Sequence, residues 1–304
     1  MRPRFLLLAA LLLLAGCGSS AGKREQASSP PQGTLNGILE QAGEDVGLTE
    51  GTSDYAPGPL RLSFLVIKKD GKPVFRPTAR VWVASGLDAH PFARATAALE
   101  PVGVPGVSEH AAGDITRIYV AHLTVPRPGK FWVVAEPVGG PPIQAVGNLI
   151  VRKRTAAPSV GDRAIPSKTP TISSTGGNFK ALTTRVPPDK GLLRYSVARS
   201  LAARKPFVLV FATPKFCTSR TCGPVVDVVD AVRRRSAETG IRFIHVEIYK
   251  DNDPSLGVNR WVKEWRLPTE PWIFLVGRDG RIKATFEGSV SPGELAAAVA
   301  RQLT

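Results

Sequence analysis

The chain has 304 residues, of which 43% are hydrophobic, and a formal net charge of +15 at pH 7. This length accommodates about two domains of ordinary size, and the hydrophobic content excludes an intrinsically disordered protein. The positive charge would suit an anionic partner, but Lys and Arg are scattered along the chain and form no basic run interleaved with aromatic residues. A nucleic-acid partner is therefore not expected, and attraction to an anionic membrane or wall surface is the simpler use of the charge.

The first residues have the composition of a secretory signal. Two arginines precede an apolar run, residues 5–15, which is too short to span a bilayer comfortably. The string LAGC at residues 14–17 resembles the bacterial lipobox, in which the cysteine is acylated and becomes the mature N-terminus. The resemblance implies a signal peptide at 1–16, a lipidated Cys17 and an extracytoplasmic, membrane-anchored lipoprotein of the cell envelope. The alternative is an ordinary signal peptide with a chance cysteine near its cleavage site.

The cysteines become informative once the lipid anchor is assigned. The chain has three cysteines. With Cys17 attached to lipid, Cys217 and Cys222 remain as each other's only partners, in a protein exported to an oxidising compartment. The polar, Ser/Pro/Gly-rich residues 17–57 are typical of a flexible tether between the anchor and the first folded domain.

Residues 58–153 have the alternating pattern of an all-β domain. Strands are expected at residues 60–67, 79–84, 117–125, 130–135 and 143–151, and a looser segment rich in Pro and Gly at 85–114. Short strands separated by turn residues, with no helical period, predict a small antiparallel sandwich. The stretch 119–136 resembles the Ig-like accessory domains of bacterial envelope proteins, which implies an Ig-like sandwich. Residues 154–188, rich in Pro, Ser, Thr and Lys, are expected to be a linker.

The pattern changes again over residues 189–304, where helices and strands alternate. Helices are expected at residues 191–204, 225–237, 259–265 and 292–302, and strands at 207–211, 241–248, 272–276 and 282–287. This order predicts a mixed sheet with helices on its faces.

That order, with a cysteine where the first strand meets the next helix, resembles the thioredoxin fold. The resemblance rests on the string FATPKFCTSRTCGP at 211–224, on Pro271 before a buried strand, and on the Gly-tipped hairpin that follows. It implies a fold class of an α/β thioredoxin-like domain preceded by the all-β Ig-like sandwich. It also implies that Pro271 is a cis-proline beside the reactive cysteine and shapes the surface that receives a substrate chain. Glu270 and Phe216 would flank that surface. Glu270 could tune a thiol pKa, and the alternative is a solvated surface carboxylate.

The cysteine pair departs from the family in its spacing. A thiol at a helix N-terminus meets unpaired N–H groups and the positive end of the helix dipole, so Cys222 is the favoured nucleophile and Cys217 the resolving thiol. Val225 occupies the place of the family's second cysteine, which leaves a Cys-x4-Cys pair, and the strand at 207–211 carries no acidic residue. The expected function is thiol–disulfide exchange on exported envelope proteins, with an unknown redox donor, membrane attachment through the N-terminal lipid, and no cofactor.

Three other functions remain open at this point. The same spacing resembles atypical two-cysteine peroxiredoxins, in which Cys217 would attack peroxide and Cys222 would resolve the sulfenic acid, although the family's Pro-x-x-x-Thr-x-x-Cys pattern is missing. The pair could instead form an inert disulfide in a non-catalytic binding or assembly module. Copper chaperones of the same fold use two cysteines and a histidine, but His245 lies in mid-strand and is expected to be packed, so no metal site is expected.

Overall fold

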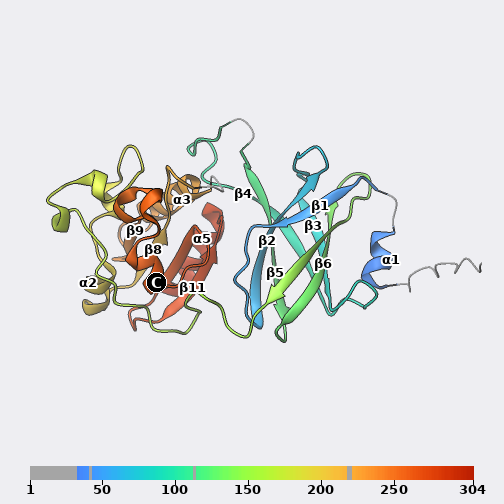
Figure 1. Cartoon of the computed structure of the whole chain (residues 1–304). Helices are drawn as coiled ribbons and strands as arrows, with labels where there is room; N and C mark the ends of the chain where they lie inside the picture. The colour runs from blue at the N-terminus through green and yellow to red at the C-terminus, as the bar shows by residue number, and fades with distance from the viewer. Residues whose placement is uncertain (1–32, 41–42, 112–113, 218–220) are drawn as a thin grey trace, which may run out of the picture.

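The computed structural model describes residues 33–40, 43–111, 114–217 and 221–304 (Figure 1). The expected signal peptide at 1–16 and the lipidated Cys17 lie outside these residues. Within the described ranges, no helix is both long enough and apolar enough to cross a membrane. Two β-sheets organise the chain, one closed and one open, and Figure 1 shows them side by side.

The N-terminal sheet is a closed barrel in the order β1-β2-β5-β4-β3-β6-β7. Its strands span Val46–Glu50 (β1), Gly58–Lys68 (β2), Thr78–Ala84 (β3), Ala93–Pro101 (β4), Arg117–Val125 (β5), Gly129–Val138 (β6) and Ala145–Val151 (β7). β1 and β7 close the barrel in parallel, with Gly47 opposite Val146. A Cβ on Gly147 would lie 2.8 Å from Leu48 Cδ2, so the glycine allows these two strands to approach closely.

Alternate side chains fill the barrel. On β2, Leu60, Leu62, Phe64 and Val66 are buried on one face, as the period of two requires of a strand with one face in a core. Phe64 stacks on Tyr119 with 5.3 Å between ring centroids. A short helix, α1 (Leu35–Leu39), packs its buried Leu35 in a separate apolar cluster outside this core.

The expected fold class, an α/β thioredoxin-like fold preceded by an Ig-like sandwich, is wrong. The sheet predicted as a sandwich at 58–153 is a closed seven-stranded barrel, and more described residues of the chain lie in strands than in helices. Two barrel strands lie where none was expected: β4 in the loose segment, and β1 within the expected tether. β4 is rich in alanine, which has low strand propensity, and β1 is only five residues long. β4 pairs with β3 and β5, and β1 pairs with β2 and β7, so the hydrogen bonds of the sheet make both segments strands.

The second sheet has four strands in the order β11-β10-β8-β9. They span Phe207–Phe211 (β8), Arg242–Val246 (β9), Trp272–Val276 (β10) and Ile282–Glu287 (β11). β8 pairs with β9 in parallel, and the other two pairings are antiparallel. β8 and β10 are buried along their whole length because both faces of the sheet are covered.

Helices cover the two faces of this sheet. The helices are Val197–Ala202 (α2), Cys222–Arg235 (α3), Arg260–Glu264 (α4) and Pro292–Leu303 (α5), with single 3-10 turns at Ser173–Thr175, Phe179–Ala181, Lys190–Leu192, Lys250–Asn252 and Pro254–Leu256. Valines of α3 and apolar residues of α5 share one core with Val208 and Val210. The other face buries Phe207 and Phe211 against Trp265, at the end of α4, and Val197.

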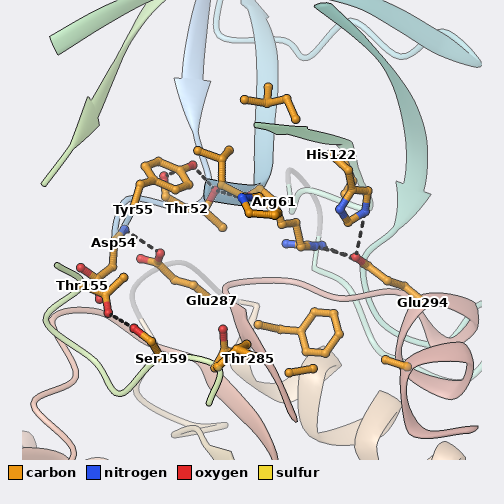
Figure 2. A pocket seen from close by; sticks show the side chains of 18 of the residues that line it. Thr52, Asp54, Tyr55, Arg61, His122, Thr155, Ser159, Thr285, Glu287 and Glu294 are labelled. Atoms are coloured by element: carbon orange, nitrogen blue, oxygen red, sulfur yellow. Dashed lines mark hydrogen bonds and ion pairs between the residues drawn. The ribbon is translucent and has the colours of Figure 1, made fainter. Parts of the chain in front are cut away.

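Polar contacts join the barrel to the second sheet. The Glu287 carboxylate at the end of β11 accepts hydrogen bonds from the Ser53 N–H at 2.8 Å, the Ser53 hydroxyl at 2.9 Å and the Asp54 N–H at 2.9 Å. Arg61 of β2 forms a two-pronged ion pair with Glu294 of α5, at 2.7 and 2.9 Å. Figure 2 shows both contacts on the walls of a groove of about 1210 Å³ between the two parts.

Arg61→Ala should destabilise the protein by about 3 kcal/mol, because it leaves the Glu294 carboxylate without its nearly buried partner. Urea unfolding measures the free energy of unfolding. Lys72→Ala is the control, since Lys72 forms an exposed ion pair with Asp70 and such pairs contribute little. Equal stabilities for the two variants would show that the Arg61–Glu294 contact does not hold the two parts together.

Candidate redox site

A disulfide bond joins Cys217 to Cys222, with 5.9 Å between their Cα atoms. Cys217 lies in the loop that follows β8, and Cys222 is the first residue of α3. The two sulfur atoms differ in exposure: Cys222 is fully buried, whereas Cys217 is only partly buried. The Cys222 N–H lies 3.3 Å from the Cys217 sulfur and donates a hydrogen bond to it.

The start of α3 follows from its sequence. Val225, Val226 and Val229 are buried on the side of the helix that packs on the sheet. Pro224 is the third helical residue, where its missing N–H removes no intrahelical hydrogen bond. The helix therefore begins at Cys222 and directs its free N–H groups and positive dipole end toward the cysteine loop.

The hydrogen bond and the burial of the two cysteines bear on the expected roles, which stay a prediction. Cys222 was expected to be the nucleophile because it begins the helix. The helix N–H, however, points at the sulfur of Cys217, and a thiolate on Cys217 is the one that this hydrogen bond would stabilise. Of the two cysteines, Cys222 is fully buried and Cys217 only partly so.

Glu270 lies beside the cysteine pair. One of its carboxylate oxygens and the two sulfur atoms all lie within 4.8 Å of one another. Glu270 is joined to Pro271 by a cis peptide bond. Two sulfurs and a carboxylate could hold a metal ion if the cysteines were reduced, but sulfurs bonded to each other are not thiolate ligands. In the disulfide form, the group is therefore an acid next to a redox pair.

The third expected surface residue, Phe216, points its ring at Tyr249. The two rings meet edge to face with 6.4 Å between centroids, and the Lys215 ammonium lies 5.2 Å from the centre of the Phe216 ring. The structure thus brings Glu270 to the sulfurs, whereas Phe216 packs on Tyr249, in the segment after β9. His245 is buried, and its Nε2 lies 3.0 Å from the Ala212 carbonyl oxygen, as expected of a packed histidine.

Burial raises the pKa of two glutamates in this part of the structure, Glu270 and Glu50. It raises the pKa of Glu270 above its usual range, and the nearby Glu247 carboxylate adds to the increase. Burial also raises the pKa of Glu50, at the end of β1, from 4.5 to about 7, with a further contribution from Glu287. Both acids therefore hold protons at higher pH than an exposed glutamate does.

Glu50 and Glu270 line the same cavity. It has a volume of about 290 Å³ and lies between the end of the barrel and the second sheet. Thr221, the residue before Cys222, also lines it. Glu50 was not expected from the sequence, because this residue falls in the segment expected to be a tether and nothing in its neighbours indicates burial.

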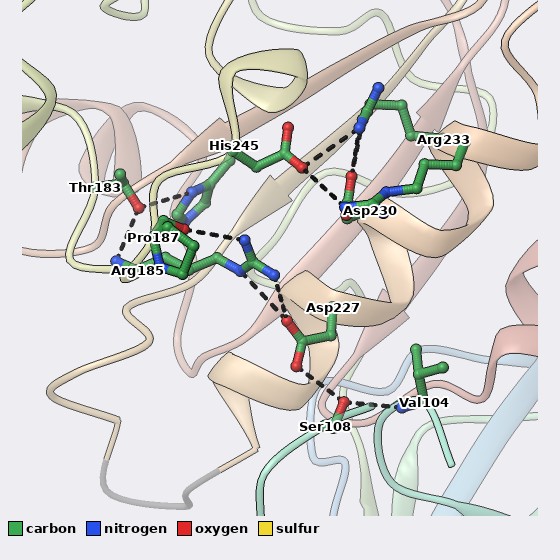
Figure 3. Close-up of polar contacts among 11 residues, drawn as sticks. Val104, Ser108, Thr183, Arg185, Pro187, Asp227, Asp230, Arg233 and His245 are labelled. Carbon is green, nitrogen blue, oxygen red and sulfur yellow. Dashed lines mark hydrogen bonds and ion pairs between the residues drawn. The ribbon is translucent and has the colours of Figure 1, made fainter. Parts of the chain in front are cut away.

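A loop of the barrel packs on α3 close to the cysteines. Asp227, in the second turn of α3, accepts hydrogen bonds from the Ser108 hydroxyl at 2.9 Å and from Arg185 Nη2 at 2.8 Å (Figure 3). Ser108 in turn accepts the Val104 N–H at 2.9 Å, and Val104 packs against the apolar cluster that contains Cys222. The loop between β4 and β5 is therefore attached to the helix that begins with Cys222.

Comparison with known proteins adds little to this geometry. No family model matches the chain, and no curated protein matches it. Among solved structures, it is similar to a thiol:disulfide interchange protein of the thioredoxin family from Chlorobium tepidum TLS, with 15% identity, covering 35% of this chain and 85% of that chain, at a TM-score of 0.26. A similarity this low does not define the fold or the activity of this chain.

Glu50→Gln should change how stability depends on pH. Because the pKa of Glu50 is higher in the folded chain than its ordinary value of 4.5, the folded state binds more protons between pH 4.5 and 7, and stability falls as pH rises through this window. The variant should lack this loss. Its free energy of unfolding at pH 8, relative to that at pH 4, should exceed the wild-type value by about 1 kcal/mol, a figure that already includes solvent screening of a partly exposed group. Urea unfolding at both pH values checks it.

The control for this measurement is Glu44→Gln, since Glu44 is half-exposed and pairs with Lys68 at the surface. The raised pKa of Glu50 would be contradicted if the free energy of unfolding changed between pH 4 and pH 8 by the same amount in the wild type, Glu50→Gln and Glu44→Gln.

Proposed function

We propose that this protein carries out thiol–disulfide exchange through the Cys217–Cys222 pair. The observation that supports it best is the hydrogen bond from the Cys222 N–H to the sulfur of Cys217. This contact stabilises a thiolate on the less buried of the two cysteines, which favours both attack by Cys217 and its release as a leaving group.

The exchange proceeds in two steps that balance electrons and protons. A thiolate of a partner protein attacks the Cys217 sulfur, the bond between the two cysteines breaks, and Cys222 leaves as a thiolate that takes a proton from Glu270. A second thiolate of the partner then attacks the partner's own sulfur in the mixed disulfide and releases Cys217 as a thiolate. The partner's two thiols become a disulfide, and the cysteine pair is reduced. The reverse sequence reduces a partner disulfide.

One observation favours a second candidate, an inert disulfide in a binding or assembly module. The sulfur of Cys222 is fully buried, and a bond with one buried sulfur resists attack from that side. The partial exposure of Cys217 and the acid beside it favour exchange instead, since a bond that serves only to hold a loop needs neither.

We also propose that the protein is a lipoprotein of the cell envelope whose partners are exported proteins with thiols or disulfides. The proposal rests on the lipobox-like string that ends at Cys17. Attachment there would place the redox site in an oxidising compartment, where a disulfide of this kind is maintained.

Cys222→Ser should trap a partner on Cys217, because the buried thiol that resolves the mixed disulfide is missing. The expected result with insulin, in a Cys17→Ser background, is a covalent adduct at Cys217 by mass spectrometry and loss of insulin reduction. Cys217→Ser should form no adduct and have no activity. A stable adduct on Cys222 in the Cys217→Ser variant, with none on Cys217 in the other, would reverse the roles proposed here.

Cys17→Ser should abolish lipid attachment. In a bacterial expression host fed labelled palmitate, the wild-type chain should incorporate label and partition into detergent, and the variant should do neither. Cys217→Ser is the control and should incorporate label as the wild type does. Equal labelling of wild type and Cys17→Ser would contradict the assignment of this cysteine.

A further inference from the structure

Cleavage of the disulfide creates a charge in a buried place. When a partner attacks Cys217, the leaving Cys222 sulfur becomes a thiolate among the apolar residues of the α3 core. A buried anion without a partner is costly, so a proton must reach this sulfur. β8, the strand that leads into the cysteine loop, consists of Phe, Val and Leu and supplies no acid. The acid nearest to the two sulfurs is on another element, at Glu270.

We propose that Glu50 of the barrel is a positioning residue of the redox site, which passes protons to and from Cys222 through Glu270 across the cavity between the barrel and the second sheet. This inference rests on the exchange reaction proposed above. It assigns the barrel a part in the chemistry in addition to any binding role.

The proposed proton path from Glu50 toward the Cys222 sulfur runs through the cavity that Glu50 and Glu270 line. Val46 and Leu48 of β1 pack against the barrel core, and Glu50 is the next residue on the same face of the strand, where the strand ends. Glu50 and Glu270 both line the cavity, and Glu270 also reaches the sulfurs. The volume of about 290 Å³ has room for several water molecules at roughly 30 Å³ each, which can carry protons between two carboxyl groups.

Glu50 itself has the bonding expected of a carboxyl that exchanges protons. Among the described residues, its Oε1 atom is buried and has no hydrogen-bond partner. An acid held only for structure is expected to have its buried oxygens bonded, as Glu287 does with Ser53, Asp54 and Thr269. The burial of this unbonded oxygen makes a charge on Glu50 costly and favours a proton on the carboxyl group.

The charges around Glu50 favour its protonated form. Glu287 of β11 accepts four hydrogen bonds from donors on both parts of the chain, which stabilises its charge and leaves a fixed anion near Glu50. Tyr55 is uncharged, and Arg61 of β2 is occupied by Glu294. Glu270 faces the same cavity from the other side. With its pKa raised to about 7, Glu50 can both give and take a proton near neutral pH.

The proton balance closes with solvent as the source. A partner thiolate attacks Cys217, the sulfur–sulfur bond breaks, and the Cys222 thiolate takes the proton of Glu270. Glu270 then regains a proton from Glu50 through the cavity, and Glu50 regains one from solvent. In the reverse direction, the same groups remove the proton from the Cys222 thiol before it attacks the mixed disulfide on Cys217.

The test compares three full-length variants, Glu50→Gln, Glu50→Asp and Glu44→Gln, for the rate at which reduced thioredoxin or dithiothreitol reduces the disulfide between pH 5.5 and 9. In the wild type, the rate should show an inflection near pH 7. Glu50→Gln should lose this inflection and be about tenfold slower at pH 7, less than the ~10²-fold of a directly placed acid. Glu44→Gln should match the wild type.

A second readout separates proton transfer from a structural effect. Absorbance at 240 nm follows the thiolates of the reduced pair, and the apparent pKa of Cys222 in a Cys217→Ser background should shift when Glu50 is replaced by Gln. If Glu50→Gln does not fold, Glu50→Asp provides the test, since its shorter side chain and lower intrinsic pKa should move the inflection to lower pH.

The outcomes separate this inference from the proposed function. If the reduction rate of Glu50→Gln depends on pH as the wild-type rate does, the role of Glu50 is overturned and exchange stays intact. Where Glu50→Gln does not fold, an unchanged profile for Glu50→Asp has the same meaning. A wild-type disulfide that neither thioredoxin nor dithiothreitol reduces in the folded protein would overturn the exchange reaction itself.

Discussion

The arrangement of the redox site depends on one carboxylate, that of Glu287. It lies at the end of β11, accepts hydrogen bonds from Ser53 and Asp54 of the barrel, and accepts another from Thr269, the residue before Glu270. One side chain thus fixes the barrel against the second sheet and the segment that carries Glu270. Its fixed negative charge also contributes to the raised pKa of Glu50. Glu287 therefore contributes to the packing and orientation of this interface, and adds to the effect of burial on the pKa of Glu50.

The second feature of the site is the unequal exposure of two bonded sulfurs. Cys217 is partly exposed and receives a helix N–H, whereas Cys222 is buried in the core of α3. A partner thiolate would therefore attack this disulfide at Cys217. The buried Cys222 sulfur, released as a thiolate, would need a proton source. The acids near the pair, Glu270 and then Glu50, meet that need through a cavity that neither part of the chain would form alone.

The sequence predicted five of the seven barrel strands and all four strands of the second sheet, but neither β1 and β4 nor the closure of the barrel. The bounds of β10 and β11 match the predicted strands because their apolar runs end at clear turn residues, and the cysteine pair, Glu270 and Pro271 were found from local motifs. The barrel depends on pairings between distant strands, such as β1 with β7, which no local period reveals. Glu50 was missed for the same reason: it shares a cavity with residues far away in the sequence, such as Glu270, and no local pattern reveals this.

The most direct test of the account is the reduction potential of the Cys217–Cys222 bond in the folded protein, measured by equilibration with glutathione buffers and trapping of free thiols. An exchangeable pair should equilibrate with a potential above about −300 mV. A potential below that value, or a bond that does not equilibrate while the chain stays folded, would contradict exchange and leave the disulfide as a structural bond.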